Sequence, residues 1–374
     1  MTRRVLGVAL ALVCFAALFS APLYLSPFKL SLLGRFLALG MLGVGISLIW
    51  GFTGILSLGQ GVFFALGGYA IAMHLVLVKV GGKLPDFMAR SFKPRIESLP
   101  WWWAPFESPV FATAMVFALP AVAAALLATL VFWRRISGVY VALITQALVL
   151  AFTTLIISQQ SYTNGFNGLT NFATLYGFSL TSSSGRVGLY LATAVALFLT
   201  WLFAQWLTNT HFGKILVAIR DGENRTRFLG YNTTPYKVVI FTVAGVMAGV
   251  AGAFFTVHAG IISPKDVGVA PSIEMVVWVA IGGRESILGA MLGMVLGNLA
   301  ADAVSSRFPE SWPIMLGALF VIVGMVLPKG LAGLFSGLWT KARAPQPLDK
   351  TDKLDKTDKK EAAPLPRTEV RDVR

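Results

Sequence analysis

Cysteine, histidine and charged side chains are all scarce in this chain. Its 374 residues contain one cysteine, Cys14, and three widely separated histidines, His74, His211 and His258. A single cysteine excludes an intrachain disulfide and a cysteine-based metal site. No HExxH motif or paired-carboxylate spacing occurs, so we expect no metal ion and no enzymatic centre. GxxxxGK[ST] is also missing, so we expect no cofactor here, and any ATP must be hydrolysed by a partner subunit.

The scarcity of charge points to a membrane protein. Charged residues make up 13% of the chain, against roughly 25% in soluble proteins. Hydrophobic residues make up 56%, and the mean hydropathy is +0.73. The formal net charge is +14, but the basic residues lie mainly in short loops, as membrane topology requires. No nucleic-acid-binding module occurs, so we expect no nucleic acid partner.

Apolar runs predict an all-α polytopic protein with about ten spans. The first, 5–25, is long enough to cross the bilayer, although Ser20 and Ala21 also form a possible signal-cleavage site. Between 272–281 and 287–304, two glycines beside Arg284 and Glu285 favour a tight turn over one long helix. The other predicted spans are 30–49, 54–78, 110–132, 139–157, 187–207, 237–258 and 313–334.

Basic residues also set the expected orientation. Arg3 and Arg4 place the N-terminus in the cytoplasm, and an even number of spans returns the C-terminus to the same side. The loop 79–109 then lies outside, although its five basic residues oppose the positive-inside bias.

The chain divides by composition into two parts. We expect residues 1–340 to form the transmembrane domain and residues 341–374 to form a disordered cytoplasmic tail, since the tail repeats LDKTDK and has no apolar face.

The stretch 50–74 is the most unusual span. Small residues recur there at steps of three and four, which on a helix form one stripe for close packing: Gly54, Ser57, Gly61, Ala65, Gly68 and Ala72. Gly245 with Gly249, and Gly289 with Gly293, make similar steps. Gln60 lies beside the stripe, where its amide needs a protein partner or a hydrated path.

Polar residues within the spans are candidates for a solute pathway. They carry amides and hydroxyls rather than fixed charges, and together with one neighbouring aromatic residue the set is Ser57, Gln60, Phe64, Thr145, Gln146 and Asn298. Arg35, Glu274 and Asp302 lie near span ends, and we expect them to snorkel to the interface.

The segment 209–236 predicts a pair of amphipathic helices on the cytoplasmic surface. Apolar residues recur at helical spacing before Asp221 and Gly222, which break the helix, and 223–229 begins a second one. The apolar face either docks a partner or lies on the membrane or on its own helices. We favour docking, through Phe212, Ile215, Ile219, Arg220, Asp221, Arg225, Phe228 and Leu229.

Three stretches together resemble a known family. WGFTGILSLGQGVFFALGGYAIAM, FGKILVAIRDGENRTRFLGYN and SIEMVVWVAIGGRESILGAMLG are similar to the permease subunit of branched-chain-amino-acid-type bacterial ABC importers. Within that family KLPDFM, LPWWWAPF, NGFNGLTNF and FPESWPIMLGALF resemble the urea permease subunit.

The resemblance implies a type II ABC importer permease in the bacterial inner (plasma) membrane. Its partners would be a second permease subunit, cytoplasmic ATP-binding subunits at 209–236, and a periplasmic or lipid-anchored solute-binding protein. Gln60 stands where the family often has histidine, which argues against a proton-dependent role there. Urea, which is uncharged and rich in donors and acceptors, suits amide and hydroxyl groups. A branched-chain amino acid or short amide importer and a stand-alone channel are the alternatives.

Overall fold

The computed structural model describes residues 2–89, 96–312 and 314–319, and this part of the chain is mostly helical. The helices are α1 (Thr2–Ser20), α2 (Pro27–Ile46), α3 (Gln60–Val80), α4 (Asp86–Ala89), α5 (Pro109–Trp133), α6 (Val139–Ser158), α7 (Gln160–Thr163), α8 (Ser183–Asn209), α9 (His211–Phe228), α10 (Thr233–Ala259), α11 (Pro264–Val267), α12 (Val269–Gly282) and α13 (Ile287–Ser305). A turn of π-helix, Ser47–Gly51, continues α2.

Seven of the described helices are long and apolar enough to cross a membrane. They are α2 with its π-helical turn, α3, α5, α6, α8, α10 and α13. Residues 9–23 and α12 are shorter apolar helices. Each predicted span up to 287–304 therefore corresponds to a helix. The span 313–334 lies outside the described residues except for 314–319, and the tail 341–374 lies outside them entirely.

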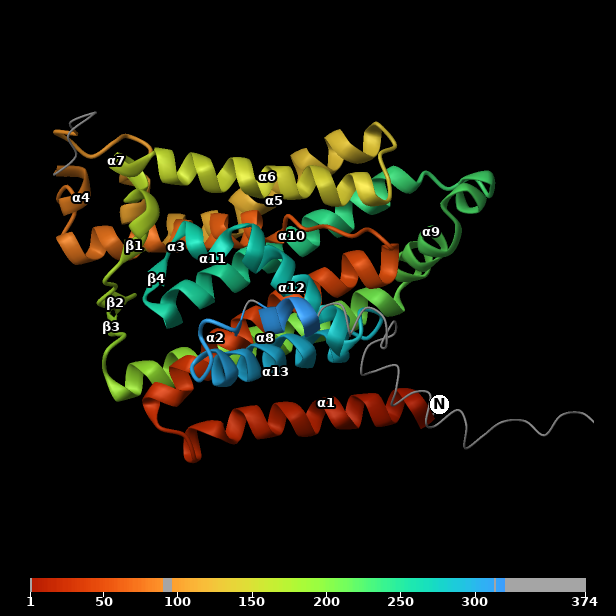
Figure 1. Cartoon of the computed structure of the whole chain (residues 1–374), viewed down its shortest axis with the longest axis horizontal. Coiled ribbons are helices and arrows are strands. Elements are labelled where there is room, and N and C mark those ends of the chain that lie inside the picture. The colour runs from red at the N-terminus through yellow and green to blue at the C-terminus, as the bar shows by residue number, and fades with distance from the viewer. Residues whose placement is uncertain (1, 90–95, 313, 320–374) are drawn as a thin grey trace, which may run out of the picture. The chain divides into compact units, whose positions relative to one another are not determined.

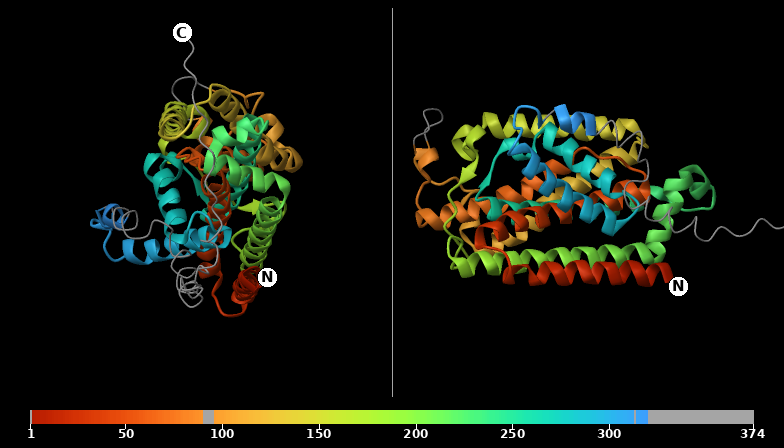
Figure 2. Two further views of the ribbon diagram at one scale, coloured as in Figure 1. Left: turned by 90° about the vertical axis from the view of Figure 1, so that its right-hand side faces the viewer. Right: turned by 60° about the horizontal axis from the view of Figure 1, so that its bottom comes forward.

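Helices α3 and α10 cross closely in the interior. Both contact α5, and α10 also packs along α2 (Figures 1 and 2). Glycines allow the approach, because a Cβ on Gly67 would collide with the carbonyl of Gly249, and one on Gly252 would collide with that of Phe64. Within a membrane the hydrophobic effect does not hold helices together as it does in soluble proteins, so close van der Waals packing of this kind stabilises the bundle instead.

The connections between spans gather at two ends of the bundle (Figure 1). One end carries α4, α7 and four short strands. There β1 (Leu169–Thr170) pairs antiparallel with β4 (Ile261–Ile262), and β2 (Thr174–Leu175) pairs with β3 (Phe178–Ser179). Helix α9 and the start of α1 lie at the other end. Helix α4, in the loop after α3, thus lies at the end opposite α9, as the predicted topology requires.

One prediction about the central span is wrong. The run 54–78 does not begin a helix at Gly54, because α3 starts only at Gln60 and residues 54–59 are not helical. Gly54 has φ of +73°, a left-handed conformation that glycine tolerates. Gly54 and Ser57 therefore do not belong to a packing stripe on α3.

Candidate solute pathway and coupling site

The chain breaks its helix between α2 and α3. After the π-helical turn, residues 54–59 leave the helical conformation, with Ile55, Ser57 and Gly59 buried. Non-helical backbone at membrane depth is tolerated only where protein covers it or where it lines a water-filled cavity. Transporters use discontinuous helices of this kind at solute sites, and π-helical turns often mark functional positions.

Two predicted pathway residues hold this break in place. The backbone N–H of Leu58 donates to Thr145 Oγ1 on α6 at 3.0 Å, and that of Gly59 donates to Ser57 Oγ at 3.3 Å. Thr145 is fully buried, and its hydroxyl also donates to the carbonyl of Ala142 at 3.0 Å. Ser57 and Thr145 thus satisfy backbone groups that a regular helix would have paired by itself.

Gln60, at the first turn of α3, supplies an amide that no described residue satisfies. Its side chain is 2% exposed, yet neither its amide nitrogen nor its amide oxygen has a hydrogen-bond partner there. The same holds for the amide of Gln146 on α6 and for the hydroxyl of Ser272 on α12, which lies against Gly61. Burying such a group unpaired costs about 1–3 kcal/mol, so these atoms are suited to bond water or a polar solute.

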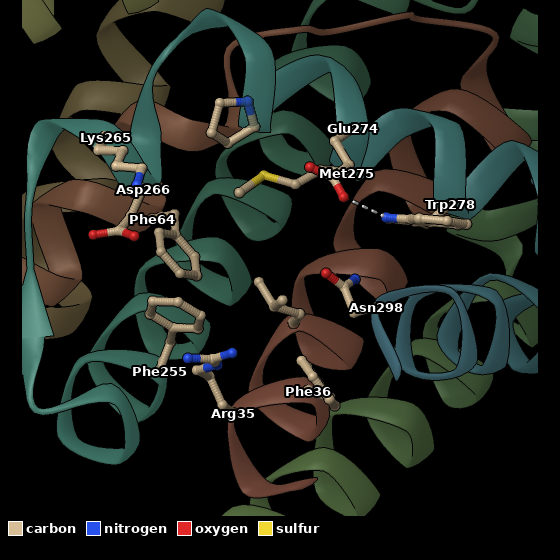
Figure 3. Close-up of a pocket in the computed structure, with 12 residues that line it drawn as sticks. Arg35, Phe36, Phe64, Phe255, Lys265, Asp266, Glu274, Met275, Trp278 and Asn298 are labelled. Carbon is tan, nitrogen blue, oxygen red and sulfur yellow. Dashed lines mark hydrogen bonds between the residues drawn. The ribbon is translucent and has the colours of Figure 1, made fainter. Parts of the chain in front are cut away.

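A pocket of about 250 Å³ lies between α2, α3, α10, α11, α12 and α13 (Figure 3). Two of the predicted pathway residues, Phe64 and Asn298, line it. The ring of Phe64 meets that of Phe255 edge-on at 5.2 Å between centroids, and Asn298 donates to the carbonyl of Met294 at 2.8 Å. The volume suits a small solute, since pockets that take drug-sized ligands measure about 300–1,000 Å³.

Two of the charged residues predicted to lie near span ends also line this pocket. Arg35 lies over the ring of Phe255 at 5.8 Å and 3.8 Å from the carboxylate of Asp302, and both Arg35 and Glu274 line the pocket. Glu274 accepts a hydrogen bond from Trp278 Nε1 at 3.2 Å (Figure 3). The signal was available in the sequence, because an ionisable residue inside a span marks a functional site by default.

The predicted pathway residues therefore fall into two groups. Ser57, Gln60 and Thr145 meet at the helix break, with Gln146 next to Thr145 on α6, whereas Phe64 and Asn298 line the pocket. Phe64 lies one helical turn after Gln60 on α3, so the same helix carries both groups.

The apolar face of α9 is covered by other helices of the chain, which corrects the docking prediction for that face. Ile215 is 5% exposed and Ile219 is 3% exposed, and the ring of Phe212 packs on that of Tyr236 at 5.4 Å. Phe228 and Leu229 instead expose 90% and 77% of their surface. Among the apolar residues predicted to couple, this pair at the far end of α9 is the one that stays open to a partner.

Helix α9 bends at Gly222, where φ is 179° and ψ is 82°, as the Asp221-Gly222 pair predicted. Before the bend, Arg220 donates from Nε to Asp221 at 2.9 Å. After it, Arg225 donates to the carbonyl of Asp221 at 3.3 Å. Arg220 and Arg225 therefore each donate a hydrogen bond to Asp221, within the same segment.

A charged cluster holds the second half of α9 against α10. Glu223 Oε2 accepts from Lys237 Nζ at 2.5 Å, and its Oε1 accepts from Arg227 at 2.6 Å and from Thr233 at 2.9 Å. Burial alone would raise the pKa of Glu223, but bonds from Lys237 and Thr233 and the charges of Lys237 and Arg227 outweigh it and lower that pKa. The cluster thus favours the ionised carboxylate.

The predicted packing glycines lie at helix crossings, apart from Gly54. A Cβ on Gly68 would come 2.7 Å from Thr256 Oγ1, and one on Gly245 would come 2.6 Å from the Cβ of Ala124. Gly249 faces Pro120 of α5, and Gly289 and Gly293 face Gly282 across α12 and α13. Gly54 lies instead against the side chain of Arg220, whose Cγ would be 3.3 Å from a Cβ there.

A bundle of apolar spans with a helix broken inside it, and with uncharged polar groups gathered at the break, defines a membrane transport protein. The comparison with protein families is more specific. Residues 29–324 match the model of the branched-chain amino acid transport system permease component. The chain therefore belongs to this permease family.

Individual relatives extend this result. The chain is 26% identical over 314 residues to the high-affinity branched-chain amino acid transport system permease protein LivM of Salmonella typhimurium, covering 78% of this chain and 67% of LivM. LivM of Escherichia coli K12 matches at the same identity and coverage. The autoinducer 2 import system permease protein LsrC of Yersinia pseudotuberculosis is 31% identical over 150 residues, covering 38% of this chain and 40% of LsrC. No solved structure matches the chain.

Proposed function

We propose that this chain is one permease subunit of an ATP-driven importer for a small, polar solute without net charge, with urea as the first candidate. The observation that carries the proposal is the buried, unpaired amide of Gln60 at the helix break. An amide offers both a donor and an acceptor, as urea does, and adds no fixed charge. The four segments that resemble urea permeases support urea in particular.

A branched-chain amino acid is the second candidate solute. The pocket in Figure 3 carries Arg35 and Glu274, which have the opposite charges that a zwitterion needs, beside the apolar walls of Phe64 and Phe255. The similarity to LivM favours the same solute class.

Transport by this chain requires partners. We infer that ATP-binding subunits dock at α9, where Phe228 and Leu229 are exposed, and that a second permease subunit completes the pathway. A periplasmic or lipid-anchored solute-binding protein then delivers solute at the opposite end, which carries α4 and α7. In this orientation α9 and both termini are cytoplasmic, and the membrane is the inner membrane.

Uptake into vesicles tests the proposal. The complete importer, reconstituted with its ATP-binding subunits and binding protein, should accumulate labelled urea only when ATP is supplied. Gln60→Leu should lower that uptake roughly tenfold, because a solute passing the break loses its hydrogen bonds there. Gln60→Asn, which keeps the amide, should retain more uptake than the leucine variant.

The possible outcomes separate the hypotheses. Accumulation of labelled leucine without urea would select the second candidate. Downhill flux without ATP would indicate a channel. Equal uptake by the wild type and Gln60→Leu would show that the solute does not contact the helix break at Gln60.

A further inference from the structure

Two turns meet at the end of the bundle that carries α9. One is the π-helical turn after α2, and the other joins α12 to α13 through Gly283 and Arg284. Ser47 Oγ donates to the carbonyl of Arg284 at 2.8 Å, and the guanidinium of Arg284 lies over the ring of Trp50 at 5.0 Å. A Cβ on Gly51 would collide with the same carbonyl, so the two turns pack backbone to backbone.

Arg220 of α9 reaches both turns. Its NH1 donates to the carbonyl of Gly51 at 2.8 Å and lies 3.7 Å from the carboxylate of Glu285. The side chain of Arg220 is 28% exposed, and Gly54 packs on its stem. The guanidinium is therefore directed into the permease rather than toward a docking partner, unlike the exposed ring of Phe228.

The turn held by Arg220 leads directly into the helix break. From Gly54 the chain runs through residues 55–59 to Gln60, and Thr145 fixes Leu58 within that run. One hydrogen bond, from Arg220 to Gly51, and residues 52–59 thus separate α9 from the unpaired amide of Gln60. The hydrogen bond from Arg220 to Gly51 connects α9 directly to the turn that precedes the break, a connection that an isolated surface helix would lack.

We propose that Arg220 is the positioning residue that transmits movement of the ATP-binding subunit to the two turns at the cytoplasmic end of the pathway. Its hydrogen bond to Gly51 and its ion pair with Glu285 make α9, the helix break and the α12–α13 turn move together. This inference rests on the proposed importer function. It assigns Arg220 to transmission and leaves docking to Phe228 and Leu229.

The ratio of solute accumulated to ATP hydrolysed tests the proposal in vesicles containing the complete importer. Labelled urea and labelled leucine are the probes, and the variants are compared on whichever solute the wild type transports. Arg220→Gln should lower the ratio about fivefold or more, while the ATP-binding subunit still co-purifies as it does with the wild type. Arg220→Lys should give an intermediate ratio, because its ammonium keeps the charge but lacks the planar fork with which the guanidinium bonds Asp221 and Gly51 at once. Arg134→Gln, which removes an exposed arginine between α5 and α6, is the matched control.

Loss of the ATP-binding subunit from Arg220→Gln in proportion to the loss of transport would overturn the proposal, since Arg220 would then be a docking residue. An unchanged ratio would also overturn it. If Arg220→Gln does not reach the membrane, Glu285→Gln replaces it, with a smaller fall in the ratio expected and an unchanged ratio again contradicting the proposal. A wild-type importer that moves neither solute with ATP would instead refute the proposed function itself.

Discussion

The ionic cluster between α9 and α10 gives the most direct energetic prediction. Replacing Glu223 by glutamine leaves Lys237, whose side chain is 6% exposed, without its carboxylate partner. Among the described residues, the ammonium of Lys237 then keeps the ring of Phe132, 5.5 Å from Nζ, and at best the neutral amide oxygen of the glutamine. The second half of α9 should therefore separate from α10 more readily.

The size of the effect follows from burial. Breaking a fully buried ion pair costs about 3–5 kcal/mol because the remaining charge is left uncompensated. The side chain of Glu223 is 24% exposed, so water screens part of the charge, and glutamine still offers an acceptor oxygen. We therefore expect about 2 kcal/mol of lost local stability, or a roughly thirtyfold larger population of the open state.

Hydrogen exchange of the backbone amides at 223–229 measures this opening. Exchange in the purified, detergent-solubilised chain should accelerate roughly thirtyfold in Glu223→Gln and stay unchanged in Glu310→Gln, which neutralises an exposed glutamate. Equal exchange in the wild type and Glu223→Gln would refute the reasoning, because the cluster would then contribute nothing to docking α9.

The pH dependence has a definite sign. The pKa of Glu223 is lowered in the folded chain, so the cluster's stabilisation is complete above the ordinary carboxyl pKa. It is lost as the pH falls through the lowered pKa of the folded chain. After correction for intrinsic rates, wild-type exchange should accelerate over that acidic range, and Glu223→Gln should lack this transition.

Two further predictions concern docking and packing. Phe228→Asp should weaken co-purification of the ATP-binding subunit roughly ten- to hundredfold without preventing membrane insertion, since a buried phenylalanine contributes about 1.5–3 kcal/mol. Phe166→Asp, an equally drastic change at the opposite end, is its control, and unchanged co-purification of Phe228→Asp would contradict the assignment. Gly67→Ala should destabilise the crossing of α3 and α10 by about 1–3 kcal/mol and lower the melting temperature, because the added methyl meets the carbonyl of Gly249. Gly188→Ala on α8, where nothing lies within 4 Å, should melt no lower than the wild type, and equal melting of the two variants would exclude tight packing at Gly67.

Local composition was enough to predict the spans and the bend in α9. An apolar run of about 20 residues favours a helix in a bilayer, because a helix pairs its backbone polar groups within the segment itself. The run 110–132 accordingly becomes α5, with bounds that differ by one residue at each end. Asp221-Gly222 likewise places the bend, since glycine leaves helical geometry at little cost.

Only the tertiary structure decided where the central helix breaks and which surfaces remain open. The spacing of Gly54, Ser57 and Gly61 fits a helix equally well, and what stabilises the break is a hydroxyl on Thr145, 87 positions away from Leu58. Likewise, the sequence shows that Ile215 and Phe228 are both apolar. Only the packing of the folded chain buries Ile215 and leaves Phe228 exposed. Span formation depends on each residue's own preference for lipid, whereas the break, the pocket and the link through Arg220 depend on partners that only the folded chain brings together.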